Sequence, residues 1–297
     1  TIEHQIKKHG TIPPKDFKKW AVICEHIIRH YNYGWANGFN LNIEYWEIWN
    51  EPDLDHDNST NKRTWGGTQS QFFDFYETAA KHLKSCFPEL KIGGPALACN
   101  EQWAADFLST MKKRNVPMDF FSWHIYCNEP SQLIGRAERL KKMLAANGFE
   151  NTESILDEWN YVKGWKEYFI YSIKTIIGMK GAAFTMACMS AAQHSSIDML
   201  MYYDTRLSVF CGLFDYYTYE PLKGYYPFKW YGMFYDMEAE IKCSTEIKDI
   251  YTLCGVDSSN KTLTVITYYT DNDNAEEKTV NIDFSKNANC NSKLKQN

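Results

Sequence analysis

The feature that most constrains the fold is a regular alternation of helix-like and strand-like segments from Pro13 onward. In the helix-like segments apolar residues recur every three or four positions, whereas the strand-like segments are short, apolar and bounded by turn-forming residues. Such alternation is typical of a parallel α/β fold, in which each helix connects neighbouring strands. Helices are predicted at residues 14–33, 69–86, 101–114, 131–146, 164–193 (with breaks allowed at Gly178 and Gly181) and 227–241, and strands at 43–49, 90–95, 118–126, 154–158 and 197–203.

The C-terminal part has a different pattern. Residues 248–256, 263–269 and 279–284 alternate apolar and polar side chains, and polar turns separate them. This pattern is typical of antiparallel strands joined by hairpins. We therefore expect an α/β domain over residues 1–243 and a small β-domain with a polar tail over residues 244–297.

Composition narrows the functional classes. The chain of 297 residues is 44% hydrophobic and 23% charged, which is typical of a globular protein with a large core. Its net charge is −5 and it has no long basic run, so we expect no nucleic-acid partner. No apolar run is long enough to span a bilayer, so we expect no membrane partner. The nine scattered cysteines favour reduced intracellular thiols, and a secreted form stays open as an alternative.

Two strand-like runs end in carboxylates. The first is Trp46-Glu47-Ile48-Trp49-Asn50-Glu51-Pro52, and the second is Ser154-Ile155-Leu156-Asp157-Glu158-Trp159-Asn160. A carboxylate at the end of a buried strand is costly to desolvate unless it is paired. In a barrel of parallel strands the chemistry is carried by the strand ends. The pattern therefore predicts a pair of catalytic carboxylates, Glu51 and Glu158.

The sequence around these glutamates resembles clan A of the glycoside hydrolases, which are retaining enzymes on a (β/α)₈ TIM barrel with the acid/base on strand 4 and the nucleophile on strand 7. Residues 46–52, Ile92-Gly93-Gly94-Pro95-Ala96 and Asp119-Phe120-Phe121-Ser122-Trp123-His124-Ile125-Tyr126 are most similar to family 39, which contains β-xylosidases and α-L-iduronidases. The likeness runs in order from about Pro13 to Trp230. It implies a TIM-barrel type of α/β fold and a glycosidase, β-xylosidase-like in activity.

The resemblance also implies roles for individual residues. Glu51 resembles the general acid/base and Glu158 the nucleophile, while Asn50 resembles the asparagine that binds the sugar 2-hydroxyl. His124 and Tyr126 resemble residues that line the sugar site and orient the nucleophile. Trp49, Trp159 and Tyr202 are expected at the substrate, with core packing an equal alternative for the two tryptophans. Glu47 is expected to pair with a buried donor and Asp157 to anchor a loop.

The retaining mechanism uses only two carboxyl groups and water, so no cofactor or metal is expected. The expected partner is an oligosaccharide or polysaccharide substrate. By the resemblance, residues 43–49 form strand 4, which leaves no room in the sequence before them for strands 1 and 2 or most of strand 3. We therefore expect the barrel to be completed by a second copy of the chain or by a missing N-terminal segment.

Two alternatives stay open at this point. An arabinofuranosidase of the related family 51 shares the Asp-Glu-Trp-Asn motif, but its strand 4 usually carries Gly where this chain has Trp49. A non-catalytic carbohydrate-binding barrel remnant would explain the absent strands, but a binder would not require both carboxylates. Family 39 is therefore preferred, and sugar specificity and exo or endo action are left open.

Overall fold

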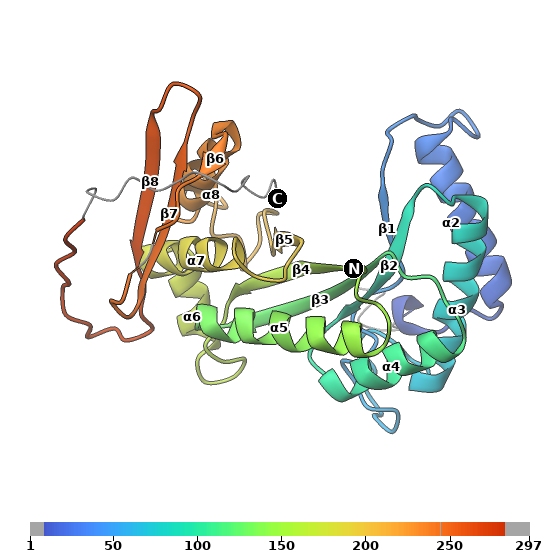
Figure 1. Ribbon diagram of the computed structural model, residues 1–297. Coiled ribbons are helices and arrows are strands. Elements are labelled where there is room, and N and C mark those ends of the chain that lie inside the picture. The colour runs from blue at the N-terminus through green and yellow to red at the C-terminus, as the bar shows by residue number, and fades with distance from the viewer. Residues whose placement is uncertain (1–8, 244, 283–297) are drawn as a thin grey trace. The chain divides into compact units, whose positions relative to one another are not determined.

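The computed structural model describes residues 9–243 and 245–282 (Figure 1). Its contacts divide the chain into two compact units. Unit 1 comprises Thr1–His124 and Arg139–Asp157, and unit 2 comprises Ile125–Glu138 and Glu158–Asn297. Strands β3 (Phe120–Cys127) and β4 (Glu153–Tyr161) and helix α5 (Pro130–Ala146) each contribute residues to both units.

Unit 1 alternates helices and parallel strands, as the sequence predicts. Strand β1 pairs in parallel with β2, and β2 pairs in parallel with the first half of β3. The first half of β4 follows β3 in the sheet, because the Glu153 N–H donates to the Asp119 carbonyl. The elements before β3 are the 3₁₀ turn η1 (His9–Thr11), α2 (Phe17–Asn32), β1 (Tyr45–Glu47), α3 (Gln69–Cys86), β2 (Lys91–Leu97) and α4 (Glu101–Lys113).

Local sequence sets where the helices of unit 1 begin. Asp16, Thr68 and Asn100 each accept a hydrogen bond from a backbone N–H in the first turn of α2, α3 and α4. Such caps satisfy donors that have no partner within the helix. Gly148, just after α5, has a φ of 74°, the left-handed conformation that commonly ends a helix.

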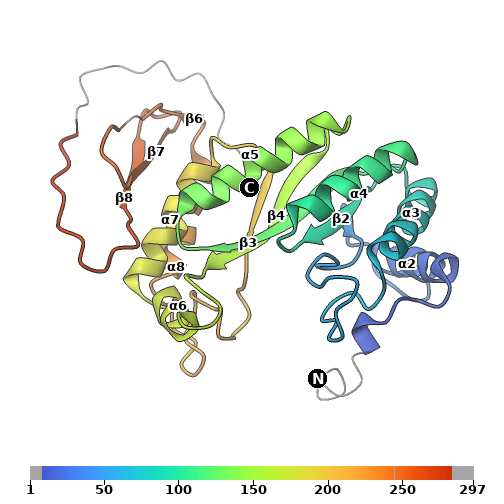
Figure 2. The same ribbon diagram turned by 90° about the horizontal axis from the view of Figure 1, so that it is seen from below.

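Much of the high aromatic content lies in the core of unit 1. Helix α3 lies between α2 and α4 (Figure 2), and their facing sides carry a cluster of aromatic rings. Most of these rings meet edge to face or tilted, the arrangement that aromatic pairs prefer. The buried members are Trp65, Phe72, Phe73, Phe75, Tyr76, Trp103 and Phe107.

Unit 2 contains the end of the parallel sheet and a small antiparallel sheet. The strand order in its part of the parallel sheet is β3-β4-β5, and β6, β7 and β8 form the second sheet. Seven residue pairs join β7 to β8, so the predicted strands at 248–256 and 263–269 are confirmed. The elements are α6 (Phe169–Ile176), α7 (Met179–Ala192), β5 (Met199–Tyr202), α8 (Tyr225–Gly232), the 3₁₀ turn η2 (Met233–Asp236), β6 (Ala239–Glu240), β7 (Ile250–Val256) and β8 (Thr262–Tyr268).

Three predictions for unit 2 differ from the structure. The helix predicted at 164–193 is two helices, α6 and α7, bent by 78° at Gly178. The helix predicted at 227–241 ends at Gly232, because the chain turns through η2 into β6. Residues 279–282 of the third predicted C-terminal strand are irregular and residues 283–284 lie outside the described residues, so β6 supplies the third strand instead.

The remaining expectations concern boundaries, membranes and thiols. The domain division at residues 243 and 244 stays a prediction. Within the described ranges no single helix is long and apolar enough to cross a membrane, and α6 and α7 reach that length and composition only as a bent pair. The eight cysteines that the structure describes are free thiols.

Candidate active site

Glu51 lies in an unusual loop at the end of β1. Trp49 and Glu51 both have positive φ, 69° and 50°, a conformation that is uncommon for residues other than glycine. The loop is held in place because the Glu51 N–H donates to the Ala96 carbonyl and the Thr64 hydroxyl donates to the Glu51 carbonyl. Conformational strain that surrounding contacts maintain is a feature of functional sites.

The Glu51 carboxyl is paired with a buried histidine of β3. His124 Nδ1 lies 2.8 Å from Glu51 Oε1, and the histidine side chain is 1% exposed. On the other side of the ring, His124 Nε2 lies 3.4 Å from Asp157 Oδ2. His124 therefore bridges two carboxyl groups within unit 1.

Glu47 extends this group of ionisable side chains. Its carboxyl interacts with the Ser122 hydroxyl and with Asp157, although the residue itself has solvent-exposed surface. Desolvation of the carboxyl by surrounding protein atoms is the largest cause that raises the pKa of Glu47 above the ordinary glutamate value, and the negative charge of Asp157 is the second. The sequence correctly suggested that Glu47 pairs with a donor, but its contact with Asp157 has no signal in the sequence.

Glu158 has a different environment in unit 2. It lies inside the regular strand β4, and the Tyr126 phenol donates a hydrogen bond of 2.7 Å to Glu158 Oε2. Desolvation and then the charge of Glu158 raise the pKa of the neighbouring Tyr203. The Tyr203 phenol therefore stays neutral near neutral pH.

Aromatic residues of unit 2 surround Tyr126. Its ring contacts Trp165, Tyr203 and Phe210 at centroid distances of 5.2, 6.2 and 5.8 Å. Trp165 is 58% exposed, which leaves its surface accessible to a ligand. These residues lie in loops after β4 and β5, where no periodic pattern marks them.

Asn160 explains how the loop after β5 is held. Its side-chain amide is buried and donates to the carbonyls of Tyr203 and Phe210 at 2.6 and 2.9 Å. Its side-chain oxygen accepts from the Tyr161 N–H. The last residue of the Asp-Glu-Trp-Asn motif therefore fixes the two aromatic residues that pack on Tyr126.

The other predicted substrate residues differ in how far they are buried. Trp49 packs against Trp20, Trp65 and Phe75, and its indole N–H donates to the Thr64 carbonyl. Asn50 is exposed beside it at the strand end.

In unit 2, Trp159 is 1% exposed and packs against Phe184 and Tyr202. Tyr202 also contacts Phe228, and burial raises the pKa of its phenol. Core packing therefore accounts for the contacts of Trp49 and Trp159, and their roles at a substrate stay predictions.

One further cluster has the atom types of a metal site. Glu25, His82 and Cys86, on α2 and α3, bring one ligand-type atom each within 4.8 Å of one another. His82 Nε2 lies 2.8 Å from Glu25 Oε2, and Arg29 donates to the other oxygen of Glu25. These interactions make the cluster a hydrogen-bonded link between the two helices.

With this geometry in view, comparison with known proteins decides the family. The family model of glycosyl hydrolases family 39 matches residues 5–282, nearly the whole chain. The chain belongs to glycosyl hydrolases family 39. The resemblance of residues 46–52, 92–96 and 119–126 to family 39 is thereby confirmed.

Curated relatives of this family 39 chain include two β-xylosidases. The β-xylosidase of Geobacillus stearothermophilus is 34% identical over 128 residues, which is 41% of this chain and 23% of the relative. The β-xylosidase of Caldicellulosiruptor saccharolyticus is 32% identical over 119 residues, which is 40% of this chain and 23% of the relative.

Solved structures show the same fold. A glucosidase from Croceicoccus marinus matches with a TM-score of 0.73 and 25% identity, over 87% of this chain and 55% of that one. A family 39 β-xylosidase from Caulobacter crescentus matches with a TM-score of 0.62 and 18% identity, over 82% of this chain and 54% of that one. The expected TIM-barrel type of α/β fold with a small antiparallel sheet is confirmed, and the family 39 chain spans about half the length of these structures.

Proposed function

We propose that this chain carries the catalytic carboxyls of a retaining glycosidase of the β-xylosidase type. In this proposal Glu158 attacks the anomeric carbon while Glu51 protonates the leaving oxygen. Glu51 then takes a proton from the water molecule that releases the sugar from Glu158. The observation that carries the proposal is that each carboxyl contacts a side chain of β3, His124 Nδ1 for Glu51 and the Tyr126 hydroxyl for Glu158.

The spacing of these side chains along β3 supports the pairing of the two glutamates. His124 and Tyr126 are two residues apart, and side chains at that spacing in a strand point to the same face. A retaining mechanism requires carboxyl groups roughly 5 to 5.5 Å apart. The proposal therefore assigns Glu51 and Glu158 to one retaining mechanism.

The residue that contacts each glutamate suits the role proposed for that glutamate. The His124 ring lies within hydrogen-bond distance of Glu51, which suits a carboxyl that gives and takes a proton. A neutral phenol beside Glu158 stabilises the carboxylate without neutralising it, as a nucleophile requires. The exposed ring of Trp165 is proposed to contact the sugar, and Asn50 is proposed to bind its 2-hydroxyl.

The proposed substrate is a β-xyloside in an oligosaccharide or polysaccharide. Support comes from family 39 membership and from the two β-xylosidases among the relatives. The test is a panel of 4-nitrophenyl glycosides with the anomer of the first product followed by proton NMR. We expect the β-D-xyloside to be cleaved fastest and β-xylose to appear first.

The outcomes of this panel separate the alternatives. Preference for the α-L-arabinofuranoside would favour an arabinofuranosidase, and α-xylose as the first product would exclude retention. Binding of xylo-oligosaccharides without turnover of any glycoside would favour a carbohydrate-binding protein. Glu150→Gln is the control, because Glu150 is exposed and lies just before β4, away from both carboxyls.

We also propose that the outer edge of β1 pairs with a further strand, from a second copy of the chain or from another segment. Within the described sheet β1 pairs only with β2, and the segment that leads into β1 exposes Phe39 and Leu41. Unpaired strand edges beside apolar surface favour association. Light scattering after gel filtration tests this, with a dimer expected and a monomer at all concentrations contradicting self-pairing.

A further inference from the structure

Three side chains with metal-binding atoms meet where α2 packs on α3 in unit 1 (Figure 2). They are Glu25 of α2 and His82 and Cys86 of α3, and we call them the α2–α3 cluster. His82 Nε2 lies 2.8 Å from Glu25 Oε2 and 3.8 Å from Cys86 Sγ. All three residues are part-buried, so the cluster is held by the helices and is still open to solvent.

The helical repeat explains why these atoms meet. His82 and Cys86 are four residues apart, so their side chains lie one above the other on the same face of α3. On α2, Glu25 follows the buried Ala21 by four residues and precedes the buried Ile28 by three. Glu25 therefore shares the packed face of α2, and its carboxyl meets the two side chains of α3.

The carboxyl of the α2–α3 cluster is fixed by a residue outside it. Arg29 Nε donates a hydrogen bond of 2.8 Å to Glu25 Oε1, and this bond is the largest cause that lowers the pKa of Glu25. Glu25 is therefore an ionised carboxylate whose other oxygen, Oε2, faces His82. Hydrogen bonds that orient a ligating carboxylate in this way are characteristic of metal sites.

The separations within the cluster are close to those around a tetrahedral zinc ion. Zinc–ligand bonds of the usual lengths place a nitrogen and a sulfur ligand about 3.6 Å apart, and a nitrogen and an oxygen ligand about 3.4 Å apart. The nitrogen–sulfur separation of 3.8 Å agrees with the first value. The nitrogen–oxygen separation of 2.8 Å is that of the hydrogen bond between His82 and Glu25, which an ion placed between them would replace.

The ligand types favour zinc over calcium or magnesium. Thiolate and imidazole suit zinc, whereas calcium and magnesium take oxygen ligands. Desolvation and then the charge of Glu25 raise the pKa of Cys86, so its thiol is protonated in the metal-free chain. When the sulfur binds zinc, the thiol proton passes to solvent. The thiolate and the Glu25 carboxylate together then balance the charge of a divalent ion.

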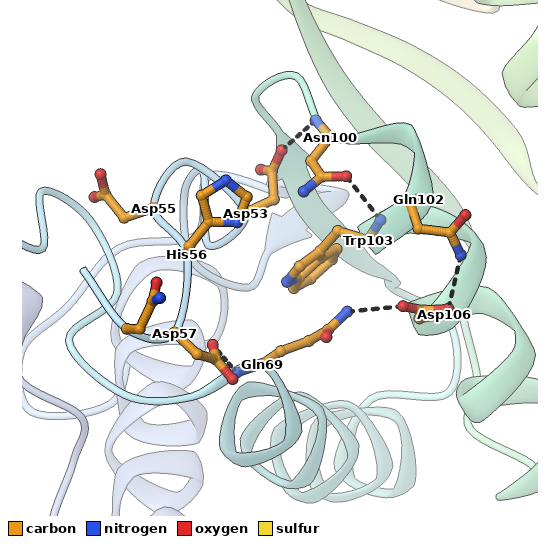
Figure 3. Close-up of a pocket in the computed structure, with 10 residues that line it drawn as sticks. Asp53, Asp55, His56, Asp57, Gln69, Asn100, Gln102, Trp103 and Asp106 are labelled. Carbon is orange, nitrogen blue, oxygen red and sulfur yellow. Dashed lines mark hydrogen bonds between the residues drawn. The ribbon is translucent and has the colours of Figure 1, made fainter.

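The acidic cavity of unit 1 offers a different set of atoms. This cavity of about 530 Å³ lies beside the loop after β1, and four of its lining residues are aspartates (Figure 3). Asp53 accepts hydrogen bonds from three backbone N–H groups, and Asp57 accepts one from the Gln69 N–H. Asp106 accepts from the side chains of Gln69 and Gln102. These oxygen atoms are committed to protein donors, so zinc is expected at the α2–α3 cluster instead.

We propose that Glu25, His82 and Cys86 bind a zinc ion that joins α2 to α3, with water as the fourth ligand. None of the three takes part in the proposed hydrolysis, so this site goes beyond the proposed function and the reaction itself needs no metal. An ion that binds the folded chain and not the unfolded chain stabilises the fold. The expected role is therefore to fasten the two helices of unit 1 to each other.

Cobalt(II) reports the ligands directly, because it takes the place of zinc and its bond to a thiolate gives a charge-transfer band in the near ultraviolet. The full chain is freed of metal with EDTA and titrated with cobalt chloride. We expect one ion per chain with a thiolate band that added zinc removes. Cys86→Ser should abolish the band, whereas Cys99→Ser, at an exposed cysteine of unit 1 outside the cluster, should leave it unchanged. A missing band in the parent chain, or a band that survives Cys86→Ser, would overturn the proposal.

Calorimetry with zinc chloride separates the cluster from the acidic cavity. Glu25→Gln and His82→Gln should each weaken zinc binding at least about 10- to 100-fold, since even the loss of a partner outside the ligand set costs that much. Asp106→Asn should leave the affinity unchanged. The reverse pattern would place the ion in the acidic cavity and contradict the proposal. Displacement of zinc by an excess of calcium chloride would also contradict it, because a site with thiolate and imidazole ligands prefers zinc.

A measurement on the unchanged chain covers the case in which the variants do not fold. Iodoacetamide modifies accessible thiols, and peptide mass spectrometry follows each cysteine separately. Zinc chloride should slow the modification of Cys86 at least about 10-fold, because a bound thiolate is not free to react. The rates at Cys99 and Cys243, both exposed, should stay the same. An unchanged rate at Cys86, or equal slowing at all three cysteines, would overturn the zinc site.

Discussion

Unit 1 and unit 2 each hold one of the proposed catalytic carboxyls, and the two surroundings differ in kind. Glu51 lies in a loop four residues beyond the end of β1 and is linked through His124 and Asp157 to Glu47. Glu158 lies within the nine-residue strand β4 and accepts a hydrogen bond from a neutral phenol. One carboxyl therefore belongs to a cluster of ionisable side chains, and the other accepts a hydrogen bond from a phenol.

The ionic network of unit 2 lies elsewhere on the same strand. Tyr161, three residues after Glu158, donates to Asp271, which is also paired with Lys163 and Lys180 at 2.8 and 3.0 Å. The His–carboxyl cluster of unit 1 and the Lys–Asp ion pairs of unit 2 are thus separate groups of ionisable side chains. We expect unit 1 to set the pH dependence of activity and unit 2 the acid stability.

The largest expected effects come from removing the two carboxyls. Glu158→Ala should abolish turnover, and Glu51→Ala should lower kcat by about 10²- to 10⁴-fold for poor leaving groups. Added azide distinguishes the roles, because it should give the inverted glycosyl azide with Glu158→Ala and the retained one with Glu51→Ala. NMR of the products checks both. The same azide anomer from the two variants would contradict the assigned roles.

The next effect concerns stability. Burial acts to raise the pKa of Asp271, but hydrogen bonds from Lys163, Tyr161 and Asn128 outweigh it and lower the pKa to about 2. A lowered folded-state pKa contributes stability above the ordinary value of 3.8, and this is lost as the pH falls toward 2. Asp271→Asn should reduce the free energy of unfolding by roughly 1 to 3 kcal/mol at pH 7, because Lys163 and Lys180 lose a half-buried ion-pair partner.

Denaturant titrations at pH 7 and pH 3 measure this change. Asp273→Asn is the matched control, because Asp273 contacts the same Lys180 but is 55% exposed, and it should cost less than about 1 kcal/mol. The pH profile of kcat should be the same in Asp271→Asn as in the parent chain. A shifted pH profile would show that the ion pairs of Asp271 influence the catalytic step. The proposed separation of unit 1 and unit 2 would then be wrong.

A smaller effect is expected from Tyr126→Phe. Removing one hydrogen bond to a charged acceptor should lower kcat/KM by roughly 10- to 100-fold. Both limbs of the pH profile should keep their positions, because the proposal gives Tyr126 no proton-transfer step. Tyr171→Phe controls for loss of a carboxylate-bonded phenol, since Tyr171 donates to Asp273. A moved limb would mean that Glu158 also depends on a titrating neighbour.

The sequence allowed prediction of features that depend on local patterns. The apolar periodicity places α2, α3 and α4 within a few residues. The carboxylate endings locate Glu51 just beyond β1, but Glu158 lies inside β4, which continues to Tyr161. The family resemblance is confirmed, whereas the roles of the site residues stay predictions.

Features that depend on residues far apart could not be predicted. Glu47 meets Asp157 across 110 positions, and Asp53 binds the start of α4 across more than 40. Neither contact has a periodic pattern. The bend at Gly178 was only an allowed break, because a glycine alone does not decide between a kinked helix and two helices.

The smallest expected effect tests the ionisable group of unit 1. The folded-state pKa of Glu47 is raised, so its contribution to stability is fully present below the ordinary value of 4.5 and declines as the pH rises above it. Glu47→Gln cannot ionise, so the free energy of unfolding of the parent chain should fall relative to this variant above pH 4.5. The difference should stay below about 1 kcal/mol, because the residue is partly exposed and water screens its charge. Denaturant titrations from pH 4 to 8 measure it, with Glu150→Gln showing no such trend. A difference that grows toward low pH would mean that Glu47 is ionised beside Asp157, and unit 1 would then hold its carboxyls by charge, as unit 2 does.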